Sequence, residues 1–377
     1  MKRRPPGSAA AGERKASAAE PKASPADLGF RMPAEWEEHA ATWIAWPHEP
    51  RDWPGKLAPI PWVYGEVVRH LTPGERVRIL VDDAAAEKRA RALLDRVGAD
   101  LTSVDFFRAP TDRSWTRDYC PLFVKDDGGQ VAITNWRFNG WAKYPNHKRD
   151  NAVTDKIARR FQLPQWQPIA EVAAKPWRVV LEGGAIDVNG AGTLLATEEC
   201  LLDTVQARNP GLARGALEEI LEAHLGARKV LWLGRGIAGD DTHGHVDDLA
   251  RFVDETTVVL AQEPNPADAN HEPLRENRER LEAMTTADGR SLRVVALPMP
   301  GPLLLDGVRL PASYANFYIG NAAVLVPTFN DPNDRRALGI LAELFPTRTV
   351  VGIHAVDLVW GLGTLHCMTQ QEPLAGR

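Results

Sequence analysis

One pattern of elements recurs along most of the chain: a β-rich run, a tight turn, a second β-rich run, a helix and a closing strand. The first complete copy has β-rich runs on both sides of the turn "DDGG" and then a helix over 150–161 and a strand over 176–182. Three later copies place helices over 211–225, 274–284 and 334–345, each followed by a strand, over 228–233, 292–298 and 348–354. The N-terminal segment, with a helix over 62–71 and a strand over 76–83, supplies a fifth.

Five ββαβ-like units of similar length favour a closed radial arrangement, because each unit can bury one of its faces only by stacking on its neighbours. We therefore predict an α/β fold in the form of a five-bladed α/β propeller. An α/β barrel and a doubly wound sheet are the alternatives that this pattern leaves open.

The first 28 residues differ in composition from the rest. They are rich in Ala, Pro, Ser and Lys and contain almost nothing large enough to build a core, so residues 1–28 are predicted to be a disordered tail. No apolar segment follows the basic start, as a secretory signal would need, and Glu13 and Glu20 argue against a transit peptide. The expected organisation is one catalytic domain over residues 29–377.

Charge and cysteine content exclude several classes of protein. A net charge of −5 offers no basic surface for nucleic acid, and no apolar run is long enough to span a bilayer. The three cysteines, Cys120, Cys200 and Cys367, are too scattered for a disulfide framework, which indicates a cytoplasmic protein. We expect no nucleic-acid or membrane partner, and a homodimer as the commonest assembly of such enzymes.

Polar residues with chemical potential fall at the joints between the repeated units. They are Asp118, Glu182, His245, Asp247 and Cys367. If the units surround an axis, equivalent joints meet in one central cleft, so three carboxylates, an imidazole and a thiol would share a pocket.

Such a pocket suits a planar cation. Clustered carboxylates repel each other unless a cation lies among them, and a guanidinium matches carboxylates through paired hydrogen bonds. A thiolate can attack the electron-poor guanidinium carbon while the imidazole transfers protons. The residues thus predict a guanidino-group hydrolase that works through a covalent thiouronium intermediate and needs no metal or other cofactor.

Several motifs also resemble a known family. "MPAEWEEHAATWIAWP", "SWTRD", "LEGG", "GHVD", "FNDPND" and "HCMTQQ" occur in the order seen in agmatine deiminases, a family of the pentein superfamily that includes bacterial-type peptidylarginine deiminases. The resemblance covers residues 31 to 373. It implies a five-bladed α/β propeller and the hydrolysis of agmatine to N-carbamoylputrescine and ammonia.

The resemblance also implies roles for single residues. Cys367 matches the nucleophile, His245 the general acid/base and Glu182 the group that orients this histidine. Asp118 and Asp247 match the pair that grips the guanidinium, and Trp115 matches a substrate-contacting tryptophan. Within "GLGTLHC", Leu362 and Thr364 depart from the agmatine pattern and are expected to line the substrate pocket. Arginine and peptidylarginine therefore remain alternative substrates.

A metal site is the main competing interpretation. In "THGHVDD", His243, His245 and Asp247 alternate, and on a strand they would share one face, as ligands of a zinc-dependent hydrolase could. The motif is incomplete because Asp248 stands where such enzymes have another histidine. Cys120 and Cys200 are interpreted as packing residues of strands, and His366, the neighbour of Cys367, as pointing away from it.

Overall fold

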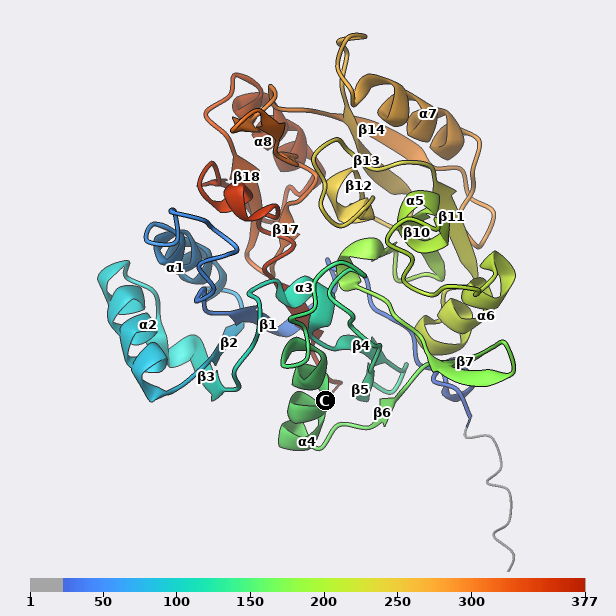
Figure 1. Ribbon diagram of the computed structural model, residues 1–377, viewed down its shortest axis with the longest axis horizontal. Coiled ribbons are helices and arrows are strands. Elements are labelled where there is room, and N and C mark those ends of the chain that lie inside the picture. The colour runs from blue at the N-terminus through green and yellow to red at the C-terminus, as the bar shows by residue number, and fades with distance from the viewer. Residues whose placement is uncertain (1–22, 377) are drawn as a thin grey trace, which may run out of the picture.

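The computed structural model describes residues 23–376, which form a mixed α/β fold (Figure 1). Most of the predicted tail, residues 1–22, lies outside the described residues. Residues 26–28 form the short 3₁₀ helix η1 (Ala26–Leu28), so the folded chain begins before residue 29. No helix among residues 23–376 is long and apolar enough to cross a membrane.

Five sheets contain three or four strands each, and two further hairpins accompany them. In spatial order the sheets are β20 (Gln370–Pro373), β1 (His39–Ala45), β2 (Arg76–Val81) and β3 (Val104–Arg108); β4 (Leu122–Lys125), β5 (Val131–Thr134) and β6 (Gln165–Trp166); β9 (Asp187–Val188), β10 (Thr193–Thr197) and β11 (Lys229–Leu233); β12 (Ala250–Phe252), β13 (Thr257–Gln262) and β14 (Arg293–Pro298); and β17 (Tyr318–Ile319), β18 (Ala323–Thr328) and β19 (Thr349–His354). The hairpins pair β7 (Ile169–Val172) with β8 (Lys175–Arg178), and β15 (Leu304–Leu305) with β16 (Val308–Arg309).

The helices connect these strands. They are α1 (Ile60–Leu71), α2 (Ala84–Arg96), α3 (Thr116–Tyr119), α4 (Val153–Phe161), α5 (Glu198–Leu202), α6 (Arg214–Leu225), α7 (His271–Glu282) and α8 (Asn333–Leu344). Single 3₁₀ turns are η2 (Leu101–Ser103), η3 (Asp150–Ala152), η4 (Gly183–Ala185), η5 (Val246–Asp248) and η6 (Leu358–Gly361). Figure 1 shows the longer helices toward the outside and the short α3 near the middle of the view.

Four of the sheets share the element order that the sequence predicts. In each, the central strand pairs antiparallel with the strand before it and parallel with the strand after it, and a helix joins the parallel pair. The central strands β10, β13 and β18 are buried along almost their whole length, as their nearly continuous apolar sequences require.

The predicted strand over 176–182 is wrong for the first of these sheets. The parallel partner of β5 is the two-residue strand β6, directly after α4, whereas β8 pairs with β7 in a separate hairpin. Ala173 and Ala174 make the hairpin turn with positive φ values of 50° and 58°. The apolar residues 179–181 are buried in an extended segment that leads to Glu182.

The remaining sheet unites distant parts of the chain. β1 pairs parallel with β2 and antiparallel with β20, so that Thr42 lies opposite Gln371. The turn that contains Cys367 comes directly before β20 and is therefore anchored against the strand nearest the N-terminus.

Candidate active site

Asp118 lies in α3, where its buried carboxylate accepts two hydrogen bonds. Trp141 Nε1 donates to Oδ2 over 2.9 Å, and the backbone N–H of Gly184 donates to Oδ1 over 3.1 Å. Burial raises the pKa of Asp118 to about 6, and the nearby His245 opposes this rise. A bound cation would stabilise the ionised form of this carboxyl group.

Glu182 is fully buried between the extended segment 179–181 and η4. The Arg208 Nε atom lies 3.1 and 3.2 Å from its two carboxylate oxygens. Burial alone raises the pKa of Glu182, but attraction to Arg208 and contact with His245 outweigh it, so the net pKa is lowered. The arginine thus keeps a negative charge beside the histidine.

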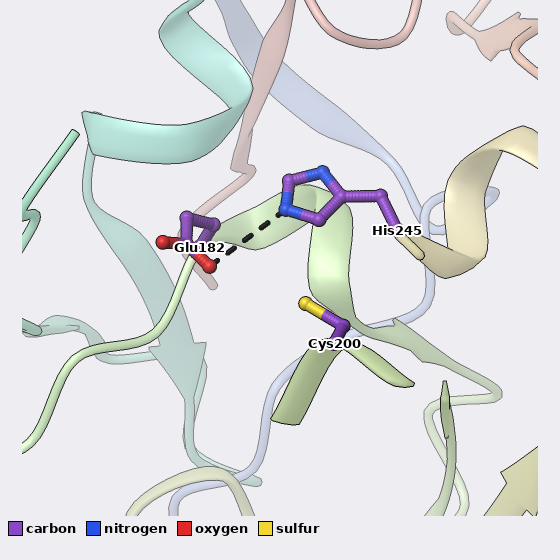
Figure 2. A group of neighbouring side chains, drawn as sticks. All are labelled: Glu182, Cys200 and His245. Atoms are coloured by element: carbon purple, nitrogen blue, oxygen red, sulfur yellow. Dashed lines mark ion pairs between the residues drawn. The ribbon is translucent and has the colours of Figure 1, made fainter. Parts of the chain in front are cut away.

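His245 lies among three carboxylates in the loop before η5. Its Nε2 is 3.7 Å from Glu182 Oε2, the pair joined by the dashed line in Figure 2, and its Nδ1 is 3.8 Å from Asp118 Oδ1 and 3.9 Å from Asp247 Oδ1. Among the described residues, neither ring nitrogen has a hydrogen-bond partner. Burial lowers the pKa of His245, but the Asp118 carboxylate and the other nearby groups raise it well above its ordinary value.

Gly184 allows the imidazole to approach Asp118. A Cβ atom at this position would lie 2.5 Å from His245 Nδ1 and 2.9 Å from Asp118 Oδ1, closer than real Cβ contacts come. The second glycine of "LEGG" is therefore a wall of the site that no larger residue can replace without moving its neighbours.

Asp247, in η5, has two carboxylate oxygens in different situations. Its Oδ2 accepts from His366 Nδ1 over 2.6 Å and from Asn316 Nδ2 over 3.3 Å. Its Oδ1 is buried and has no hydrogen-bond partner within the described part of the chain. One oxygen is thus fixed and the other remains free to accept a hydrogen bond from a ligand.

The Cys367 thiol lies beside this aspartate. Its Sγ is 3.1 Å from Asn316 Nδ2 and 3.8 Å from Asp247 Oδ2, and the residue is 7% exposed. Burial, together with the negative charges of Asp247 and neighbouring carboxylates, raises the pKa of the Cys367 thiol well above its ordinary value. The thiol is therefore protonated near neutral pH until a cation enters the site.

Alkylation should reveal this protonated thiol. Because only the thiolate reacts, iodoacetamide should modify Cys367 in the free protein at least about tenfold more slowly at pH 7 than a free cysteine, whose pKa is about 8.5. The rate should continue to rise above pH 9. Mass spectrometry of the peptide that contains residue 367 measures this rate. A rate that levels off below pH 8 would contradict the raised pKa.

A cleft leads from the surface to the thiol. It is lined by Arg51, Asp52, Arg113, Trp115, Asp118, Trp141, Tyr144, Asp241, Thr242, Gly361, Leu362, Gly363 and Cys367. Trp115 packs against Trp53 with ring centroids 5.2 Å apart. Leu362 has a positive φ of 66° and reaches the cleft, as the sequence predicts.

Thr364 does not line this cleft. Its side chain is buried, and its Oγ1 donates to Asn316 Oδ1 over 2.7 Å. The same asparagine contacts Cys367, so Thr364 supports the thiol from behind. The expectation that it lines the substrate pocket does not match its position.

Comparison with known proteins identifies the family. The family model described as Porphyromonas-type peptidyl-arginine deiminase matches residues 31–373. The chain belongs to this peptidyl-arginine deiminase family. An agmatine deiminase from Pseudomonas fluorescens is 36% identical over 368 residues, which cover 92% of this chain and 96% of the relative.

Solved structures agree with this assignment to the peptidyl-arginine deiminase family. The agmatine deiminase of Enterococcus faecalis superposes with a TM-score of 0.84 at 31% identity and covers 93% of this chain and 98% of its own. The agmatine deiminase of C. jejuni gives a TM-score of 0.78 at 28% identity, with coverage of 92% and 97%. The family resemblance found in the motifs is confirmed.

The predicted geometry of a zinc site is wrong in this member of the peptidyl-arginine deiminase family. Residues 242–245 form turns and bends rather than a strand, and His243 has a positive φ of 65°. Its Nε2 faces Asp203 Oδ2 at 3.3 Å, while His245 and Asp247 point into the site. The three residues therefore do not share a face, because the alternation rule applies only to regular strands.

Two other groups have the residue types of metal ligands. Glu182, Cys200 and His245 offer atoms within 4.8 Å of one another, as do Asp247, Asp248 and Cys367. In the first group, which Figure 2 shows, Arg208 already supplies a positive charge to Glu182. In the second, N–H donors occupy the carboxylates. Both groups have the charge balance of a protein hydrogen-bond network.

Sequence analysis missed several residues of this family member's site. Cys200 lies on α5, not on a strand, and its thiol is next to Glu182 and His245 (Figure 2). Trp141 and Arg208 hold carboxylates of the site, and Asn316 holds the thiol. These residues stand in loops, where no periodicity marks a direction. Glu35 and His366 belong to the quoted motifs, yet nothing in their spacing reveals what they contact.

Proposed function

We propose that this protein is a guanidino-group hydrolase that converts agmatine and water to N-carbamoylputrescine and ammonia. The observation that carries the proposal is the placement of the Cys367 thiol and the His245 imidazole on opposite sides of the unpartnered Asp247 Oδ1. The names of the most similar relatives point to the same substrate.

Binding of the cation starts the reaction. The guanidinium donates N–H groups to Asp118 and to Asp247 Oδ1, which are buried and short of positive charge. Its charge lowers the pKa of the nearby thiol, and the Cys367 proton is released to solvent. Substrate binding and nucleophile activation are thereby one event.

Two chemical stages follow. The Cys367 thiolate forms a bond to the guanidinium carbon, and the imidazolium of His245 gives a proton to one NH₂ group, which leaves as ammonia. The remaining thiouronium is attacked by water, from which neutral His245 takes a proton. The C–S bond breaks, the thiolate is regenerated and the urea product departs. Glu182 stabilises the charged histidine throughout.

The outer cleft favours a substrate whose far end is an amine. Arginine would need a free cation to hold its carboxylate, but the two cleft arginines are already paired: Arg51 Nε donates to Glu49 over 2.8 Å, and Arg113 pairs with Asp52. Asp52 Oδ2 is buried and has no partner among residues 23–376, so an ammonium group would be welcome there.

A substrate panel tests this proposal. Purified protein should release ammonia from agmatine, and kcat/KM for agmatine should exceed that for arginine and for a peptidylarginine by about 10²-fold or more, the effect of leaving a carboxylate without a partner. Ammonia and ureido product are both measured. Equal activity with arginine would assign the alternative substrate, and no ammonia from any guanidine would reject the proposed function.

We propose further that the five sheets are the blades of an α/β propeller around the site, and that residues 29–377 make one catalytic domain. The supporting observation is the shared strand and helix order of four sheets. The proposal includes a cytoplasmic homodimer without a cofactor, supported by the free, scattered cysteines and the metal-independent chemistry of the site.

A further inference from the structure

Two buried residues next to the site have no part in the reaction as described. His366 directly precedes the nucleophile, and Glu35 lies in the N-terminal motif "MPAEWEE". The two residues are 1% and 5% exposed, respectively. They contact each other although they are 331 positions apart in the sequence.

The His366 imidazole is held between two carboxylates. Its Nδ1 lies 2.6 Å from Asp247 Oδ2, and its Nε2 lies 2.8 Å from Glu35 Oε2. Carboxylate oxygens only accept hydrogen bonds when ionised, so both ring nitrogens must donate. A neutral imidazole has a single N–H, and therefore the geometry requires the imidazolium.

Glu35 is the centre of a charge-balanced network. Its oxygens accept from Arg251 Nη2 over 2.8 Å, from Arg117 Nη2 over 3.1 Å and from the backbone N–H of Ile319 over 2.9 Å. Arg251 also pairs with Asp187 over 2.9 Å. Three carboxylates thus face two guanidinium groups and the imidazolium, so the buried charges cancel only if His366 is a cation.

This network acts on the substrate through Asp247. The contact to His366 occupies Oδ2 and leaves Oδ1 turned toward His245, where the guanidinium binds. Burial raises the pKa of Asp247, but the hydrogen bond and charge of His366 outweigh this effect and lower it. An aspartate without this partner would be both less ionised and free to rotate.

Resting on the proposed function, we propose that His366 and Glu35 are a positioning pair that holds Asp247 ionised and correctly turned to grip the guanidinium. The pair touches neither the substrate nor the reacting atoms. It fixes the one oxygen of Asp247 that the substrate does not use, and it ties that oxygen to the rigid arginine network.

The sign of the pH effect follows from the surroundings of Asp247. The titratable and charged groups that face it are His366, His245, Cys367, Asp118, Asp248 and Arg251. Loss of the His366 charge removes a partner that favours the ionised form, so the carboxyl group keeps its proton to higher pH. Because only the carboxylate binds the guanidinium well, the acidic limb of kcat/KM should move upward in pH.

The test is steady-state kinetics of His366→Asn. An Asn amide can reach Asp247 as Nδ1 does but carries no charge and does not reach Glu35. We expect KM for agmatine to rise about 10-fold to 100-fold, the effect of losing a charge-assisted hydrogen bond, with a change in kcat of less than about threefold. The acidic limb of kcat/KM should move up by about one pH unit. Glu35→Gln should shift both in the same direction by less, and His366→Ala by more.

A matched control uses the same substitution at an exposed histidine, His354→Asn on β19, which should leave kinetics unchanged. A purely structural role would lower kcat and the amount of folded protein while leaving KM and the pH profile as they are, and that result would overturn the inference. If His366→Asn does not fold, the isosteric Glu35→Gln decides by the same readouts. Absence of ammonia release by the wild type would instead reject the proposed function.

Discussion

Replacement of Cys367 by alanine is expected to abolish ammonia release from agmatine. The thiol is the only nucleophile that the described cleft residues place beside Asp247, and without it no thiouronium can form. Where nucleophile and base act as a unit, removal of the nucleophile alone costs about 10⁶ in kcat. We expect Cys367→Ala to lower kcat by at least about 10⁵-fold, measured by ammonia release under saturating agmatine.

Cys120→Ala is the matched control. This thiol is also buried, its pKa is also raised well above the ordinary value by burial, and it lies close to Asp118 in sequence. It does not line the cleft, so its loss should leave kcat/KM within about threefold and lower stability by about 1 to 2 kcal/mol. Retention of more than about 1% of the activity by Cys367→Ala would overturn its role. Its ability to bind agmatine, seen as a rise in Tm, should persist.

Gly184→Ala is expected to cause the second large loss. The added methyl group would be placed 2.5 Å from His245 Nδ1, so the imidazole must move away from the Asp118 carboxylate. A displacement of about 1 Å in a catalytic group can cost about 10² in rate. We expect kcat/KM to fall at least about 10²-fold, with a loss of stability of about 1 to 3 kcal/mol from overpacking.

The same substitution at Gly215 provides the comparison. Gly215 lies in α6 and has no heavy atom within 4 Å of the position that a Cβ would take. Alanine there should preserve activity and add up to about 1 kcal/mol of stability through better helix propensity. If Gly184→Ala keeps near-normal kcat/KM while remaining folded, the close approach of His245 and Asp118 is not needed for catalysis.

The repeated sheets could be predicted because their signals are local. Long apolar runs such as β13 and β18, each followed by an amphipathic helix, mark their own ends in the sequence. The two-residue strand β6 carries no such signal, and the longer apolar stretch over 176–182 was interpreted in its place. That stretch is buried for another reason, since it carries Glu182 into the site.

The site residues were found by residue type and motif, but their directions were not. The alternation of His243, His245 and Asp247 was treated as a strand face, whereas the backbone there turns at His243. His366 does point away from the thiol, but within a turn and not by strand alternation. Contacts such as Glu35 with His366 join opposite ends of the chain, and a single sequence contains no information on which distant residues meet.

The pairing of β1 with β20 has a consequence for how the protein acquires its active site. These strands are about as far apart along the chain as any two of its elements, and such non-local pairing is slow because the loop-closure entropy must be lost before the contact forms. The turn bearing Cys367 is fixed only when β20 docks on β1. During synthesis, the carboxylate cluster can therefore assemble before the thiol arrives, and a nascent chain carries no reactive centre until its two ends have met.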